Sequence, residues 1–331
     1  MITVDKIYRA KLIKYFSKKD YDTKEKLEKL DCNSVSIDIR NFLLDLTFEE
    51  NGILKQNVLF SENSNNANII EDFFTSLTNK FGVDSRNVFI NTQKIDGSIQ
   101  CNYGSFDNNE QVKCIKKFIL EKYENMYTNM RNTHGKELIK SSDIFICPYC
   151  YRSYIGVIEE ENGKRVITPD LDHFYPKSKY PFLAVTLSNL VPSCLFCNQR
   201  AKSDTDFYQT SIYPPNKIFD EIKFDFDPYS GKIFIDNYYD LISQAEYKTH
   251  LDTFLIQEIY ASHTEILTNI VSKVQKYRQS KIEDISKYTV GLSSLEIKKI
   301  VFYEYEFMHK KKELLYKLKK DLYEKIVKGA K

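Results

Sequence analysis

Two short cysteine motifs offer the clearest chemistry in this sequence: CPYC at residues 147–150 and CLFC at residues 194–197. A CxxC motif serves either thiol–disulfide exchange or metal ligation. The redox use needs a helix directly after the motif, whereas the segment after Cys150 is β-branched and aromatic and predicts extended structure. Two CxxC motifs in one chain are typical of four thiolates around zinc, so we expect a structural Zn²⁺ site. Its ligands are Cys147, Cys150, Cys194 and Cys197. A thiol oxidoreductase that uses the first pair is the less favoured alternative.

The 43 residues between the two motifs are more than a compact zinc ribbon needs, and they hold further polar side chains. An imidazole titrates near neutrality and can accept a proton from water, and carboxylate and amide oxygens suit hard divalent cations. His173, the neighbouring Asp172 and Asn189 in this insert are therefore candidate catalytic residues, as is Asn198 directly after the second motif. Each has an ordinary alternative, because Asp-His also occurs in turns and Asn caps helices and turns.

Together, these residues form the pattern DHxxPxSxxP followed by xNLxPxCxxCN. Over about residues 147–210 the chain resembles the HNH endonuclease family in its zinc-stapled ββα-metal form. The resemblance implies that His173 is the general base, that Asp172 and Asn198 hold a catalytic ion, and that Asn189 pins the loop bearing the histidine. Many family members have a second histidine where this chain has Asn198, and this H-N-N variant favours Mg²⁺ or Mn²⁺.

The resemblance further implies an enzyme that hydrolyses phosphodiester bonds in nucleic acid. DNA is the family default, and RNA stays open because such a site acts on the backbone. Four basic residues are candidate phosphate contacts, or else ordinary solvated surface: Lys177, Lys179, Arg200 and Lys202. Lys202 lies four residues after Asn198, on the same face of the expected helix. The chain is also similar to HNH nucleases found beside an ATPase in bacterial phage-defence systems, which implies an ATPase partner. The alternative is a non-catalytic zinc module that binds nucleic acid or protein.

The fold class that follows is α+β: a ββα-metal core with two zinc knuckles, flanked by mainly helical regions. We expect a mixed N-terminal region of unknown role at 1–106, the nuclease domain with a preceding helix at 107–231, and a helical C-terminal domain at 232–331. The 331 residues are 42% hydrophobic, enough for a substantial core. A net charge of only +2 excludes a global basic field. No secretory signal or membrane-spanning stretch is apparent, so we expect a cytoplasmic protein with reduced thiols and no membrane contact.

Several elements are predicted around this core. The polar, Asn-rich segment 61–68 predicts a loop, followed by a helix from Ile69. A longer helix is expected from Asp107, capped with Glu110 and ended by His134-Gly135. Asn162-Gly163 predicts a hairpin turn.

Helix-compatible sequence returns near Asn198, and a loop rich in Pro, Asp and aromatic residues is expected to close this region around residue 231. The chain after it is expected to be helical. An apolar stripe from Leu255 to Tyr277 predicts one helix. Ser293 and Glu296 form a capping box for a second helix, which carries apolar residues to Leu322. From Lys298 to Lys331 there are 11 Lys against 5 acidic residues, which indicates either a solvated helix face or a surface for phosphates or a partner.

Overall fold

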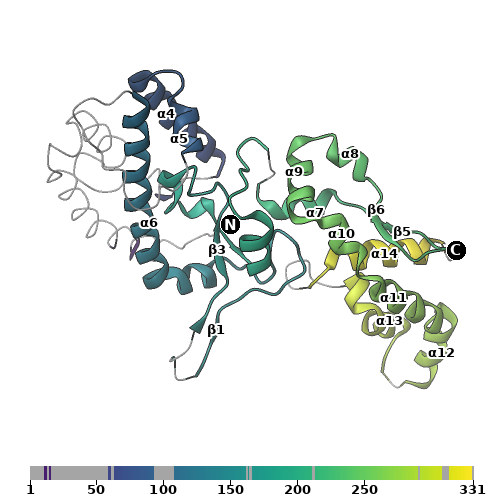
Figure 1. Cartoon of the computed structure of the whole chain (residues 1–331). Coiled ribbons are helices and arrows are strands. Elements are labelled where there is room, and N and C mark those ends of the chain that lie inside the picture. The colour runs from purple at the N-terminus through teal and green to yellow at the C-terminus, as the bar shows by residue number, and fades with distance from the viewer. Residues whose placement is uncertain are drawn as a thin grey trace. The chain divides into compact units, whose positions relative to one another are not determined.

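The computed structural model shows a mixed α+β chain in which helices predominate and each described sheet has two strands (Figure 1). This agrees with the expected α+β class. No helix in the described part of the chain is both long and apolar enough to cross a membrane. The structure describes residues 11, 12, 15, 59, 60, 63–92, 108–161, 163, 166–210, 213–289, 291–307 and 313–329.

Contacts divide the chain into two compact units. The first unit combines 1–143, 157–192 and 204–208, and the second combines 144–156, 193–203 and 209–331. Each unit is therefore built from segments that lie far apart in the sequence. The three-part division by sequence stays a prediction.

In the first unit, helix α4 (Asn63–Phe81) packs through an apolar face. Ile70, Phe73, Phe74 and Leu77 recur at helical spacing and are buried. The predicted loop over 61–68 is wrong from Asn63 onward, because these polar residues form the first turns of α4. Helix α5 (Ser85–Asn91) follows and adds Phe89 to the same aromatic core.

The long helix α6 (Asn108–Ser141) does not end at His134-Gly135, so the predicted end is wrong. A glycine inside a helix costs only about 1 kcal/mol relative to alanine. The next turn buries Leu138 and Ile139, which offsets that cost. The predicted cap at Asp107 lies outside the described residues.

Strands β1 (Ile158–Glu159) and β2 (Val166–Ile167) form an antiparallel hairpin, as predicted. Gly163 lies in its turn with a φ of +68°, whereas Asn162 lies outside the described residues. Strand β3 (Asp170–His173) pairs with β4 (Leu190–Ser193). Two 3-10 turns connect them, η1 (Pro181–Leu183) and η2 (Leu187–Asn189).

The second unit contains a strand where a loop was predicted. Strand β5 (Phe224–Phe226) pairs antiparallel with β6 (Ile233–Ile235), and the turn uses Gly231 at a φ of +68°. Burial of Phe224 favours the strand over the polar turn signals on either side of it. Turn η4 (Pro215–Lys217) and helix α7 (Ile218–Glu221) precede this hairpin.

The rest of the second unit is helical, as expected, but with more breaks. The stripe from Leu255 to Tyr277 is divided between two helices by a break after Ala261. Leu255 itself lies before the first of them, with a left-handed φ of +50°. The Ser293–Glu296 capping box is confirmed. The prediction of a single long helix after it is wrong, because helix α13 is followed by a π-helix and then by a separate helix, α14. The helices and the π-helix are α8 (Tyr238–Ile242), α9 (Ala245–Phe254), α10 (Ile256–Ala261), α11 (Thr264–Lys276), α12 (Gln279–Tyr288), α13 (Ser294–Phe302), η5 (Tyr303–Phe307) and α14 (Tyr316–Gly329).

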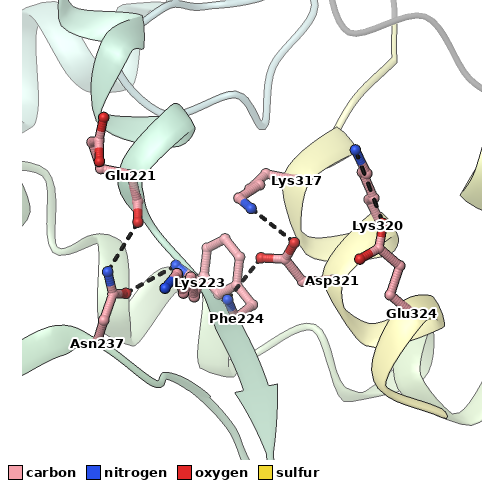
Figure 2. Close-up of polar contacts among 8 residues, drawn as sticks. All are labelled: Glu221, Lys223, Phe224, Asn237, Lys317, Lys320, Asp321 and Glu324. Atoms are coloured by element: carbon pink, nitrogen blue, oxygen red, sulfur yellow. Dashed lines mark hydrogen bonds and ion pairs between the residues drawn. The ribbon is translucent and has the colours of Figure 1, made fainter. Parts of the chain in front are cut away.

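Helix α14 is held to β5 by Asp321 (Figure 2). Its carboxylate accepts the backbone N–H of Phe224 at 2.8 Å and pairs with Lys317 at 2.8 Å. Burial raises the pKa of Asp321, against the opposing effect of these two partners. Lys320 pairs with Glu324 at 4.0 Å, so part of the local lysine excess is balanced within the helix itself.

Candidate functional site

The first cysteine motif folds into a tight knuckle. The backbone N–H of Tyr151 donates to the Cys147 carbonyl at 2.9 Å, and Tyr151 itself adopts a φ of +51°. The flanking segments then pair, because Cys147 N–H donates to Ser153 O at 2.9 Å and Ile146 bridges Tyr154. No helix follows Cys150 within the described segment 151–157, as the sequence predicted and unlike the redox arrangement.

The second motif forms a similar turn. Asn198 N–H donates to the Cys194 carbonyl at 3.0 Å, and Cys197 N–H points at Cys194 Sγ at 3.5 Å. The Cys194 N–H lies 3.4 Å from Cys147 Sγ. The second knuckle therefore directs backbone N–H groups at one sulfur of each motif, which favours the thiolate form that a metal requires.

The four cysteine sulfurs lie within 4.8 Å of one another. All are free thiols, three buried and Cys194 partly exposed. A tetrahedron with Zn–S bonds of about 2.3 Å has sulfurs separated by about 3.8 Å, so the cluster has the size and donors for zinc. Burial raises the pKa of the Cys147 thiol well above its ordinary value, and a bound cation would oppose that shift. The cluster can hold a zinc ion.

Two helical residues that the sequence did not single out support the first knuckle. His250 of α9 is fully buried and donates from Nε2 to the Tyr149 carbonyl at 3.0 Å, since a carbonyl only accepts. Tyr260 of α10 donates its hydroxyl to the Cys150 carbonyl at 2.9 Å. Burial lowers the pKa of His250 to about 4, so this imidazole stays neutral near pH 7. Such contacts fix the orientation of metal ligands, but they have no local sequence signature.

In the first unit, β3 carries Asp172 and His173, both buried. His173 Nε2 lies 2.9 Å from the carbonyl oxygen of Ala184. Because that oxygen can only accept, Nε2 carries a proton, and in the neutral form of the ring the lone pair then lies on Nδ1. Neighbouring side chains on a strand point to opposite faces, so Asp172 and His173 diverge from the backbone.

Asn189 ties together the segments on both sides of η1. Its Oδ1 accepts the Tyr175 N–H at 2.8 Å, and its Nδ2 donates to Tyr175 O at 3.1 Å and to Leu183 O at 3.2 Å. The Asn189 carbonyl also accepts the Phe174 N–H at 2.8 Å. Asn189 is fully buried, and it fixes both the loop after His173 and the turn before Ala184.

Tyr127 of α6 is a neighbour of His173 that the sequence did not reveal. The two rings meet edge to face with centroids 4.4 Å apart, and the Tyr127 hydroxyl donates to Leu171 O at 3.0 Å. Burial raises the pKa of Tyr127 to about 12, and the charges of Asp172 and Asp170 act in the same direction. Tyr127 therefore stays uncharged near pH 7, and its ring packs against the imidazole of His173. Its separation from the motif in sequence leaves no local signal for this role.

The basic candidates lie in different settings. Lys177 pairs with Glu124 at 2.8 Å, and Lys179 lies 3.7 Å from Asp206. Arg200 is exposed. A phosphate that binds Lys177 or Lys179 would compete with an acidic partner.

Asn198 and Lys202 lie on a π-helix, η3 (Phe196–Lys202), rather than on the expected α-helix. Ser203 N–H donates to Asn198 O, so the i, i+4 spacing that placed Lys202 beside Asn198 does not apply directly. Lys202 is only 1% exposed, whereas Asn198 is partly exposed. A phosphate contact by Lys202 stays a prediction, and it requires the ammonium group to become accessible.

The structure thus gathers the four cysteines within the second unit, and Asp172, His173 and Asn189 within the first. Asn198 belongs to the second unit, so its sharing of an ion with Asp172 stays a prediction. Comparison with known proteins gave no match to a family model, a curated protein or a solved structure.

Proposed function

We propose that this protein is a metal-dependent endonuclease of the HNH type, which hydrolyses phosphodiester bonds in nucleic acid. The observation that carries the proposal is the contact between His173 Nε2 and the Ala184 carbonyl. It leaves Nδ1 as a proton acceptor on a buried imidazole whose loop is pinned by Asn189. A structural histidine does not need this combination of a fixed tautomer, an adjacent carboxylate and a braced loop.

In this proposal His173 Nδ1 takes a proton from a water molecule, and the water oxygen forms the new bond to phosphorus as the P–O ester bond breaks. The leaving oxygen keeps the electron pair of that bond and takes a proton from solvent. General-base catalysis of this kind contributes about 10²- to 10⁴-fold. Tyr127 and Asn189 keep the imidazole in place while it accepts the proton. The proposal requires that Nε2–H stays hydrogen-bonded to Ala184 O, because this bond keeps the ring proton on Nε2 and off Nδ1.

Magnesium or manganese fits the oxygen donors that the resemblance assigns, namely Asp172 and Asn198. When bound, such an ion stabilises the charge that develops on the phosphate oxygens. Asp172 is 4% exposed, and a buried carboxylate is suited to binding a cation. The zinc cluster in the second unit would brace the turn that begins η3 and carries Asn198.

DNA is the favoured substrate and RNA the second, and both follow from the resemblance. The ATPase partner rests on the resemblance as well. A pull-down from the source cell that returned no stable partner would count against it.

Incubation of the zinc-loaded chain with plasmid DNA and with RNA tests the proposal. We expect cleavage with Mg²⁺ or Mn²⁺ and none with EDTA. Asp172→Asn should reduce the rate by about 100-fold or more, whereas Asp240→Asn, at an exposed position on α8, should leave it unchanged. Nucleic-acid binding without cleavage under every metal condition would instead support the non-catalytic zinc module.

A further inference from the structure

A polar side chain of helix α4, that of Asn66, contacts the turn η2, which also contains Asn189. Asn66 is fully buried, and its Nδ2 donates to Ser188 Oγ at 3.0 Å. The Ser188 hydroxyl donates in return to Asn66 Oδ1 at 3.2 Å. A buried carboxamide thus meets a buried hydroxyl 122 residues away in sequence. Such a pair is costly to separate, because each partner would leave the other without its hydrogen bond.

Ser188 and Asn189 lie in the same 3-10 turn, η2. The backbone of a short helical turn moves as a unit, so fixing Ser188 also fixes Asn189. Asn189 in turn bonds Leu183 O, directly before Ala184. The hydrogen bonds therefore connect α4 to the segment whose Ala184 carbonyl accepts the hydrogen bond from His173 Nε2–H.

The apolar face of α4 holds the same segment by packing. Phe73 stacks on Phe182 with ring centroids 4.2 Å apart and planes 24° from parallel. Phe74 meets Tyr180 edge to face at 6.3 Å. Phe182 lies two residues before Ala184, so the ring contacts of α4 hold the same segment that the hydrogen bonds through Ser188 and Asn189 reach. Two independent contacts make rigid displacement of Ala184 O unfavourable.

We propose that α4 is a positioning element for the catalytic histidine and that Asn66 is its positioning residue. Asn66 acts through Ser188 and Asn189, and it keeps Ala184 O against His173 Nε2. The lone pair is thereby kept on Nδ1. The catalytic consequence rests on the proposed nuclease function, whereas the tautomer of His173 can be measured without it.

The first test observes that tautomer directly. The chain is labelled with ¹⁵N-histidine, and long-range ¹H–¹⁵N spectra distinguish protonated from unprotonated ring nitrogens, with His173→Ala used for assignment. The wild type and Asn68→Ala should show only the Nε2–H form, since Asn68 is an exposed residue of the same helix. Asn66→Ala and the smaller change Ser188→Ala should each add an Nδ1–H population of about a tenth or more.

The second test compares cleavage kinetics well below the unfolding temperature. Asn66→Ala and Ser188→Ala should lower kcat by about fivefold or more with KM nearly unchanged, because the base is displaced and the substrate contacts are kept. The double variant should fall no further than either single variant, because both act through one contact.

Identical His173 spectra for Asn66→Ala, Ser188→Ala and Asn68→Ala would overturn the positioning role, and so would additive losses of kcat. Failure of the proposed function looks different: the wild type would cleave no nucleic acid, while the spectra would still report whether α4 controls the tautomer.

Discussion

Replacement of Asn189 by alanine tests how strongly the loop around His173 depends on one buried side chain. The substitution removes three hydrogen bonds, one from the Tyr175 N–H and two to the carbonyls of Tyr175 and Leu183. A buried hydrogen bond contributes about 1 kcal/mol, and a buried group left without its partner costs about 1–3 kcal/mol. We therefore expect Asn189→Ala to lower the free energy of unfolding of the first unit by about 3 kcal/mol.

Denaturant and thermal unfolding, followed by circular dichroism, measure this loss. For a unit of this size about 3 kcal/mol corresponds to a Tm lower by roughly 6–12 °C. The matched control is Asn129→Ala on an exposed turn of α6, which should change stability by less than about 0.5 kcal/mol. If Asn189→Ala and Asn129→Ala unfold alike, the three bonds do not hold the loop and the structural reasoning for His173 fails.

Three further predictions concern zinc, pH and the C-terminal helix. The purified chain should hold one zinc ion that mild reductant does not remove, and Cys197→Ser should lower both the zinc content and the Tm. Full zinc content in Cys197→Ser would contradict the four-thiolate site. Burial, and then the charge of Lys179, lower the pKa of Lys116 to about 8, below the ordinary value of 10.5. The unfolded chain then binds more protons than the folded chain between about pH 8 and 10.5, so the free energy of unfolding of the wild type should rise over this window by about 1–2 kcal/mol relative to Lys116→Met. Urea unfolding at about pH 8 and at about pH 10.5 measures this change. A difference between wild type and Lys116→Met that stays constant with pH would refute the prediction. Asp321→Ala should lower the free energy of unfolding by about 2 kcal/mol, because the Phe224 N–H loses its acceptor. The control Glu324→Ala, which removes only an ion pair at the surface, should lower it by less than about 0.5 kcal/mol in the same assay. Equal losses in the two variants would count against this role of Asp321.

The features that the sequence predicted well are those set by neighbouring residues. The spacing of the two CxxC motifs leads directly to the cysteine cluster, because each knuckle is a local turn. The Ser293–Glu296 capping box and the β1–β2 hairpin are local in the same sense. Helical periodicity located α4 and α6 because their apolar residues face a core.

The features that sequence reasoning missed depend on tertiary contacts. Asn63 to Asn68 have loop-like composition, yet they are helical because Asn66 finds a buried partner in Ser188. Helix α6 continues past Gly135 because later residues of the helix are buried. Tyr127, His250 and Tyr260 are recognisable only when α6, α9 and α10 are packed against the site residues. Weak local preferences lose to burial in each case.

Cleavage by His173→Ala is the most direct measurement of the central claim that this imidazole is the general base. Wild type, His173→Ala and the control His263→Ala are compared on plasmid DNA with Mg²⁺ at equal zinc content and equal folded fraction. We predict that His173→Ala is slower by about 100-fold or more and that His263→Ala cleaves at the wild-type rate. Equal cleavage by wild type and His173→Ala would contradict the account.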